Sequence, residues 1–174
     1  LFLNELYDEE FEHALAALAG EASALHEARV AEESGNQRSA YEDERILEQH
    51  FAPLLAESQA MLGALAAELG RRDVATLTQD EIDAAVDRMQ PSGELAPSFE
   101  EFFSKLKKAV KKVAGKAVAL AKKGVSLATK LGLGPVLDKL KGLIKPLLKR
   151  VIQTAIGKLP PALQPAAKKL AEKL

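Results

Sequence analysis

Apolar side chains recur at helical spacing between Phe99 and Leu131, and this pattern constrains the fold more than any other feature of the chain. When successive residues are placed about 100° apart, these side chains fall within an arc of about 120°. The apolar face comprises Phe99, Phe102, Phe103, Leu106, Val110, Val113, Ala117, Leu120, Leu127, Ala128 and Leu131. Lysines fill the opposite side, at Lys105, Lys107, Lys108, Lys111, Lys112, Lys116, Lys122, Lys123 and Lys130. Because a helix of this kind is stable only when its apolar face is buried, another surface must cover it.

Helix-forming residues prevail along the rest of the chain as well, and the alternation typical of strands is missing. We therefore expect an all-α protein built as a multi-helix bundle. The expected helices run from about Leu3 to Glu33, Ser39 to Leu69, Thr78 to Met89, Ser98 to Leu131 and Pro135 to Ile156, with a last short helix near the end of the chain. Thr78-x-x-Glu81 and Ser98-x-x-Glu101 are predicted to be capping boxes. Gly70 is expected to cap the second helix, Pro53 to kink or restart that helix, and Pro146 to bend the helix that begins at Pro135.

The charges of the chain are divided between its two ends. Residues 1–101 carry 23 acidic side chains against six arginines, a formal charge of −17, whereas residues 102–174 carry 18 basic side chains against Asp138 and Glu172, a charge of +16. The overall charge of −1 therefore hides two opposed fields. We expect an acidic helical region (1–90), a linker (91–97) and a cationic amphipathic helical region (98–174).

The motifs of common enzymes are missing from the sequence. It contains no cysteine, which excludes disulfides, thiolate metal sites and thiol nucleophiles. Glu10-x-x-His13 has the spacing used by carboxylate-bridged di-iron bundles, but the other ligands of such a site are not present. There is also no serine elbow, dinucleotide fingerprint or phosphate loop. We predict no enzyme activity, no catalytic residue, no metal or cofactor and no small-molecule substrate.

The candidate functional surface lies on the cationic helix. Its apolar face is represented by Phe99, Phe102, Phe103, Leu106, Val110, Val113, Leu120, Leu127 and Leu131, and its basic face by Lys105, Lys108, Lys111, Lys112, Lys116 and Lys123. In composition, the stretch from Phe102 to Lys123 is similar to linear cationic membrane-lytic peptides. Such helices lie in a lipid interface with the apolar face down and the lysines toward anionic headgroups. An anionic membrane surface is thus one predicted partner.

An acidic protein surface is the other predicted partner, and the acidic half of the same chain could supply it. The leading hypothesis combines the two: a toxin-like, membrane-active protein whose acidic half masks the lysine-rich half until displacement, cleavage of the linker or acidification exposes it. The alternative is a structural or cargo component of a larger assembly that binds through its lysine face. Sequence-independent binding of nucleic acid ranks third, because aromatic side chains are missing after Phe103 and Arg150 is the only arginine there.

The sequence bears on origin and topology in two ways. It starts at Leu1 without the charged and apolar segments of a signal peptide, so we expect a processed product or part of a larger chain, a setting that includes secreted proteins. Lysines interrupt the apolar stretches of the second half too often for a membrane-spanning helix, which needs about 20 mainly apolar residues.

Overall fold

The computed structural model describes residues 9–32, 40–124 and 132–157, and these residues are helical with short connections and no strand. The helices are α1 (Glu9–Glu32), α2 (Ala40–Leu69), α3 (Gln79–Asp87), α4 (Pro97–Lys122) and α6 (Leu133–Ala155), with a short 3₁₀ helix, η2 (Val74–Thr76), before α3. The prediction of an all-α protein is confirmed. The expected helical residues before Glu9 and the expected last helix lie outside the described residues.

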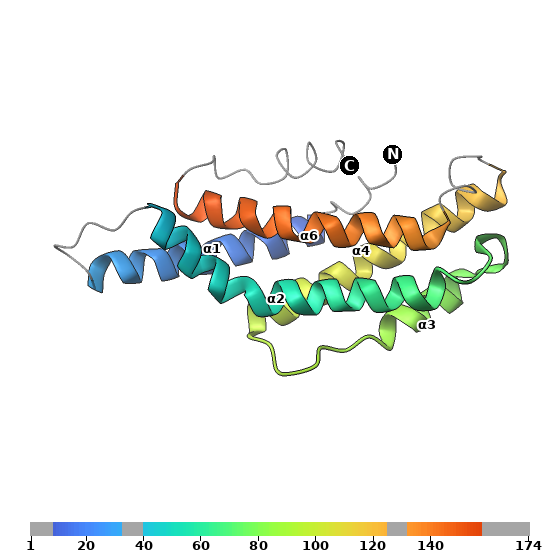
Figure 1. The fold of residues 1–174 in the computed structure, drawn as a ribbon, viewed down its shortest axis with the longest axis horizontal. Helices are drawn as coiled ribbons and strands as arrows, with labels where there is room; N and C mark the ends of the chain where they lie inside the picture. The colour runs from blue at the N-terminus through green and yellow to red at the C-terminus, as the bar shows by residue number, and fades with distance from the viewer. Residues whose placement is uncertain (1–8, 33–39, 125–131, 158–174) are drawn as a thin grey trace.

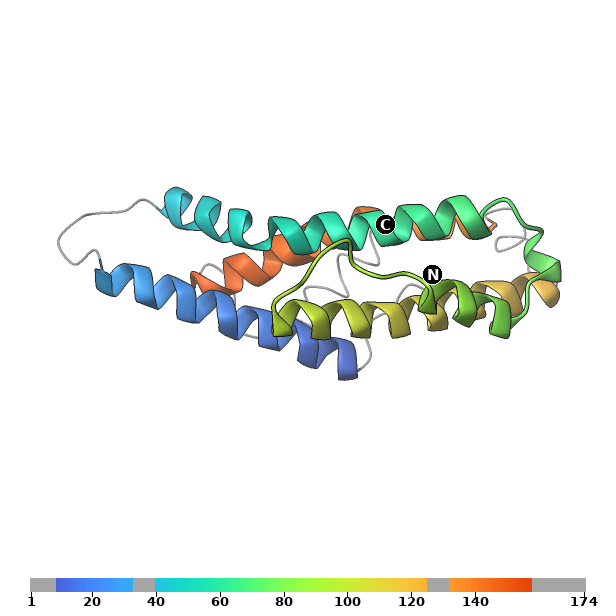
Figure 2. The ribbon, with the colours of Figure 1, turned by 90° about the horizontal axis from the view of Figure 1, so that it is seen from below.

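The long helices run along a common direction (Figure 1). α6 packs against α2 over most of its length and also contacts α1, while α1 and α3 both pack against α4. Figure 2 shows α3 alongside α4, with the segment between them reaching across to α2. α4 therefore has helices from the acidic region as its main neighbours.

One hydrophobic core runs through all of these helices. Its largest fully buried side chains include Phe11 of α1, Phe51 of α2 and Phe102 of α4. The ring centroids of Phe11 and Phe102 are 5.5 Å apart, as are those of Phe51 and Phe99, which is within the range of favourable aromatic pairs. Side chains from before and after the predicted linker thus pack into the same core. The division at residues 91–97 stays a prediction about composition and charge.

The helix starts follow the predicted capping boxes in one case of two. Thr78 Oγ1 accepts a hydrogen bond from the Glu81 backbone N–H at 3.2 Å, so the box before α3 is confirmed. The box at Ser98 is wrong: α4 begins one residue earlier, with Pro97 in its first turn and Ala96 as an N-cap without a side-chain hydrogen bond. The Ser98 hydroxyl instead donates to the Glu21 carboxylate of α1, a partner that outcompetes the local cap.

α4 is shorter than the sequence pattern predicts. It ends at Lys122, and Gly124 follows with a φ of +77°, a left-handed conformation that glycine adopts without steric cost. The Gly124 N–H donates to the Ala121 carbonyl at 3.1 Å, which completes the end of the helix. The expected extension to Leu131 falls on residues 125–131, which lie outside the described residues.

The end of α2 and the start of α6 meet at two glycines. A Cβ atom placed on Gly70 would lie 3.0 Å from the Gly134 Cα and even closer to the Ala66 carbonyl oxygen. α6 starts at Leu133, earlier than expected, after Gly132 with a φ of +61°. Both α2 and α6 continue through their internal prolines, Pro53 and Pro146. This close backbone approach sets the spacing of the α2–α6 pair at one end.

Candidate functional site

The predicted apolar face of α4 is buried inside the protein. Phe102, Leu106, Val110 and Val113 are fully buried, Phe99 and Phe103 are 5% exposed, and Leu120 is half-buried against the core. Leu127 and Leu131 lie outside the described residues. Ala109, Ala114 and Val118 are also buried. Sequence reasoning left out these three residues, although each follows an apolar residue of α4 by three or four positions, the spacing that marks a shared helical face.

Two acidic helices cover this apolar face. α1 places Phe11 against Phe102, and the two rings are tilted by 45°. α3 adds Ile82, Ala85 and Val86, all buried in the same core, from a nine-residue helix that packs against α4. The apolar face of α4, which would have to enter a lipid interface, is thus already covered by helices from the first half of the chain.

A carboxylate of α1 contacts the basic side of α4 beside these aromatic rings. Glu10 Oε2 lies 3.2 Å from Lys108 Nζ and 3.6 Å from Lys105 Nζ. The hydrogen bond from Lys108, with the charges of both lysines, holds the pKa of Glu10 below its ordinary value. About half of the Glu10 and Lys108 side chains remains exposed, so this contact orients the helices more than it stabilises them.

A second carboxylate ties the end of α3 to α4. Asp87 Oδ1 lies 2.7 Å from Lys111 Nζ, and the hydrogen bond from Lys111 lowers the pKa of Asp87. Next to this pair, Lys107 Nζ donates to the Met89 carbonyl at 3.0 Å. Lysines one helical turn apart on α4 are thus held by the residues at and just after the end of α3.

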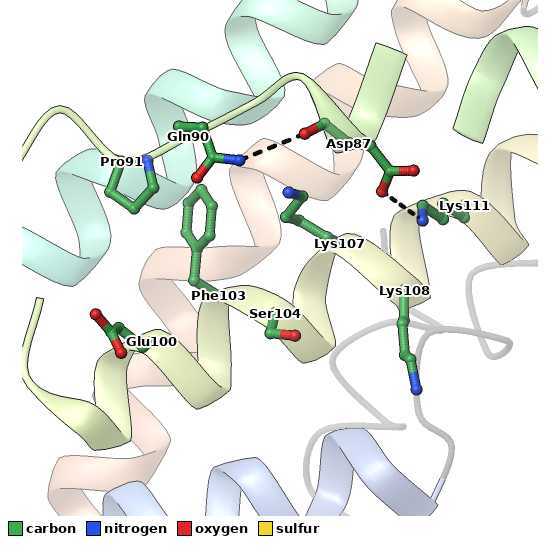
Figure 3. Close-up of a pocket in the computed structure, with 9 residues that line it drawn as sticks. All are labelled: Asp87, Gln90, Pro91, Glu100, Phe103, Ser104, Lys107, Lys108 and Lys111. Carbon is green, nitrogen blue, oxygen red and sulfur yellow. Dashed lines mark hydrogen bonds and ion pairs between the residues drawn. The ribbon is translucent and has the colours of Figure 1, made fainter. Parts of the chain in front are cut away.

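These groups surround an open cleft of about 370 Å³, shown in Figure 3. We call it the α3–α4 cleft; its lining comprises Asp87, Gln90, Pro91, Glu100, Phe103, Ser104, Lys107, Lys108 and Lys111. Its lysines already have partners: Lys107 the Met89 carbonyl, Lys108 Glu10, and Lys111 Asp87. The cleft therefore presents little free positive charge to a ligand.

The remaining lysines of the predicted basic face point to solvent. Lys112, Lys116 and Lys123 are exposed, and the first two also have interaction partners. The basic face thus divides into a part that contacts acidic helices, formed by Lys105, Lys108 and Lys111, and a part on the outside of the protein.

A polar cluster that sequence reasoning missed joins three helices. The Glu21 carboxylate of α1 accepts a hydrogen bond from Ser98 of α4 and lies 3.3 Å from Nε2 of His50 on α2. The His50 ring also packs on Phe51 and Phe99, with centroid distances of 5.0 and 5.4 Å. Because Ser98 contacts the carboxylate and not the imidazole, the cluster lacks the serine–histidine pair of a nucleophilic site. Its members are too far apart in the chain for any local pattern to predict it.

Among residues 9–32, 40–124 and 132–157, no group of three or more histidine, aspartate or glutamate side chains could hold a metal ion. His13, the partner in the Glu10-x-x-His13 pattern, is exposed. In the same parts of the chain, no helix is both long and apolar enough to cross a bilayer. Comparisons with protein-family models, curated proteins and solved structures found no match to this chain.

Proposed function

We propose that this protein is a non-enzymatic, membrane-active helical protein whose acidic helices keep a lysine-rich amphipathic helix, α4, covered until it is released. In this arrangement the acidic α1, α2 and α3 and the basic α4 and α6 form one bundle. The observation that supports the proposal is that α1 and α3 bury the apolar face of α4 while Glu10 and Asp87 contact the lysines on the same helix.

The released helix has the dimensions and side chains for a lipid interface. α4 has 26 residues, which corresponds to a length of ~39 Å. Lying flat, it would place its phenylalanines and valines among acyl chains and extend its lysines to headgroups. Each lysine near an anionic leaflet contributes about 1 kcal/mol, so the charge of α4 would favour anionic over neutral membranes.

Apolar contacts provide most of the free energy that keeps α4 covered, and the ion pairs mainly orient the helices. A buried phenylalanine or leucine side chain stabilises the closed form by about 1.5–3 kcal/mol, whereas exposed ion pairs such as Glu10–Lys108 contribute much less. A trigger that only removes charge, such as acid, should therefore loosen the cover without removing it. Cleavage of the connection between α3 and α4 removes the covalent link, so that a membrane can compete for both the apolar face and the lysines of α4.

Dye release from liposomes tests the proposal on the full chain. A protease site is inserted between the exposed residues Gly93 and Glu94, and leakage is followed before and after cleavage on anionic and neutral vesicles, at low and physiological salt. We expect leakage only after cleavage, only on anionic vesicles, and less at the higher salt. A peptide of residues 98–174 should act without cleavage. If neither the cleaved protein nor the peptide releases dye, α4 has no membrane activity.

A second candidate function is supported by the outer side of α6. Lys139, Lys141, Lys145 and Lys149 are exposed there and form no ion pair with any residue of the described ranges. Such a surface suits a component of a larger assembly that binds an acidic protein wall. Stoichiometric binding to one acidic protein, together with no effect on anionic vesicles, would favour this function over membrane activity.

A further inference from the structure

The lysines of α6 include a row that follows the seam between α2 and α6. Lys141, Lys145 and Lys149 are spaced four residues apart, so they lie on the same side of the helix. All three are exposed. A Cβ atom placed on Gly63 of α2 would lie 3.5 Å from Lys141 Nζ, so the row begins directly over α2.

An open cleft lies beside this row, which we call the α2–α6 cleft. It has a volume of about 350 Å³, near the lower end of the range for small-molecule sites. Its lining comprises Glu48, Phe51, Ala52, Leu55, Lys145, Leu148, Lys149 and Ile152. Phe51, Leu148 and Ile152 are core residues and form the apolar bottom of the cleft. Leu55 is half-buried and Ala52 is exposed, so one wall of the cleft is accessible from solvent.

No residue of the ranges 9–32, 40–124 and 132–157 neutralises the charges at the mouth of this cleft. Neither Lys145 nor Lys149 forms an ion pair with a described residue, although Glu48 also lines the cleft. In the α3–α4 cleft, by contrast, the lysines are occupied by Asp87, Glu10 and the Met89 carbonyl. An apolar cleft whose edge carries two ammonium groups without an acidic partner among the described residues is complementary to an apolar molecule that ends in an anion.

We propose that the α2–α6 cleft binds a single acyl chain with an anionic head group. The chain lies against Phe51, Leu55 and Leu148, and the carboxylate or phosphate head accepts charge-assisted hydrogen bonds from Lys145 and Lys149. A free fatty acid and a lipid of an anionic membrane share this chemistry. None of the lining residues belongs to α4, so the site exists in the closed protein and does not depend on the release of that helix.

Calorimetric titration of the full chain with monomeric dodecanoate tests the site, with two double variants of equal charge. K145Q/K149Q removes the ammonium groups at the cleft, while K122Q/K139Q removes two exposed lysines outside its lining. We expect the cleft variant to bind at least about tenfold more weakly and the control variant to bind like the unchanged protein. Ala52→Leu, which fills the accessible wall without changing charge, should also weaken binding.

Two further titrations and a flotation experiment decide which part of the ligand is recognised and where it comes from. Inorganic phosphate should not bind, because it lacks the chain, and dodecyl maltoside should bind weakly, because it lacks the charge. If K145Q/K149Q also loses flotation with anionic vesicles, the cleft takes its ligand from a membrane, whereas unchanged flotation assigns it to free fatty acid. No binding of dodecanoate, or equal loss in both double variants, overturns the proposal. Dye release by the same proteins is independent, so failure of α4 to permeabilise vesicles would leave this site standing.

Discussion

The Glu10 carboxylate lies 3.2 Å from the Lys108 ammonium, although 98 positions separate the two residues in the chain. The next residue after Glu10 is Phe11, whose ring packs on Phe102, about 1.7 turns before Lys108 on α4. A charged contact and an apolar contact between the same two helices therefore lie side by side. Low pH should weaken the charged contact, and a substitution in the core should weaken the apolar contact.

The lowered pKa values of Glu10 and Asp87 predict a loss of stability in acid. A carboxylate whose pKa is depressed by folding stabilises the protein above its unfolded pKa, 4.5 for glutamate and 3.8 for aspartate, and loses this contribution as the pH falls through the folded value. The difference in unfolding free energy between the unchanged protein and E10Q/D87N should thus be constant above about pH 5 and disappear in stronger acid. Urea unfolding at a series of pH values measures it.

E94Q/D138N is the matched control for this experiment, because the side chains of Glu94 and Asp138 are exposed and form no hydrogen bond or ion pair with a described residue. It removes one glutamate and one aspartate, like the test variant, and should show a smaller difference at every pH. Salt should reduce the effect of E10Q/D87N, since both contacts are exposed. Equal pH profiles for the two variants would show that these contacts do not stabilise the fold.

Phe11→Ala should loosen the cover of α4 without altering α4 itself. Phe11 is fully buried, so its removal should destabilise the protein by about 3–5 kcal/mol in urea unfolding. Under the proposed function, the same variant should release dye from anionic vesicles without cleavage. Phe11→Leu retains much of the apolar contact and should have smaller effects on both measurements. A destabilised Phe11→Ala protein that leaves vesicles intact would argue against α1 as a mask.

Gly70→Ala should destabilise the α2–α6 pair, because its Cβ would press on the backbone of Ala66 and Gly134. A cost of about 1–3 kcal/mol is expected, as for other overpacked sites. Gly142→Ala is the opposite case. Gly142 lies inside α6 with no atom within 4 Å of its Cβ position, so alanine should stabilise the protein by about 0.5–1 kcal/mol. Thermal unfolding of the two variants should give shifts of opposite sign.

The connection between α3 and α4 should be protected by Glu57. The Ser92 hydroxyl donates to the Glu57 carboxylate, and the Ser92 N–H does so at 3.0 Å. Both hydrogen bonds lower the pKa of Glu57, the one from the hydroxyl more than the one from the backbone, and they hold the connection against α2. Glu57→Ala should therefore speed cleavage after Glu94 by a glutamyl endopeptidase several-fold. Glu48→Ala, the same change elsewhere on α2, should leave the rate unaltered; equal rates for both variants would mean that Glu57 does not restrain the segment.

Local patterns in the sequence predict helices and faces well, and long-range partners poorly. The apolar face of α4 follows from side-chain spacing alone, because the helical period places every third or fourth residue on one side. Thr78 caps α3 because its partner is three residues away. Ser98 matches the same pattern, yet its hydroxyl bonds to Glu21, 77 positions earlier, and no local spacing can reveal such a competitor. The end of α4 was missed because the apolar period continues past Gly124, whose left-handed conformation stops the helix first.

Because both halves of the chain share a single core, the cleaved protein should respond to dilution differently from the intact protein. While the chain is intact, its connection holds α3 and α4 at an effective concentration in the millimolar range, which is typical of short tethers. After a cut at that connection, the same buried surface becomes the interface of a two-chain complex with an ordinary dissociation constant. The fraction of uncovered α4 would then depend on protein concentration, so a cleaved sample would be closed in a concentrated stock and open after dilution.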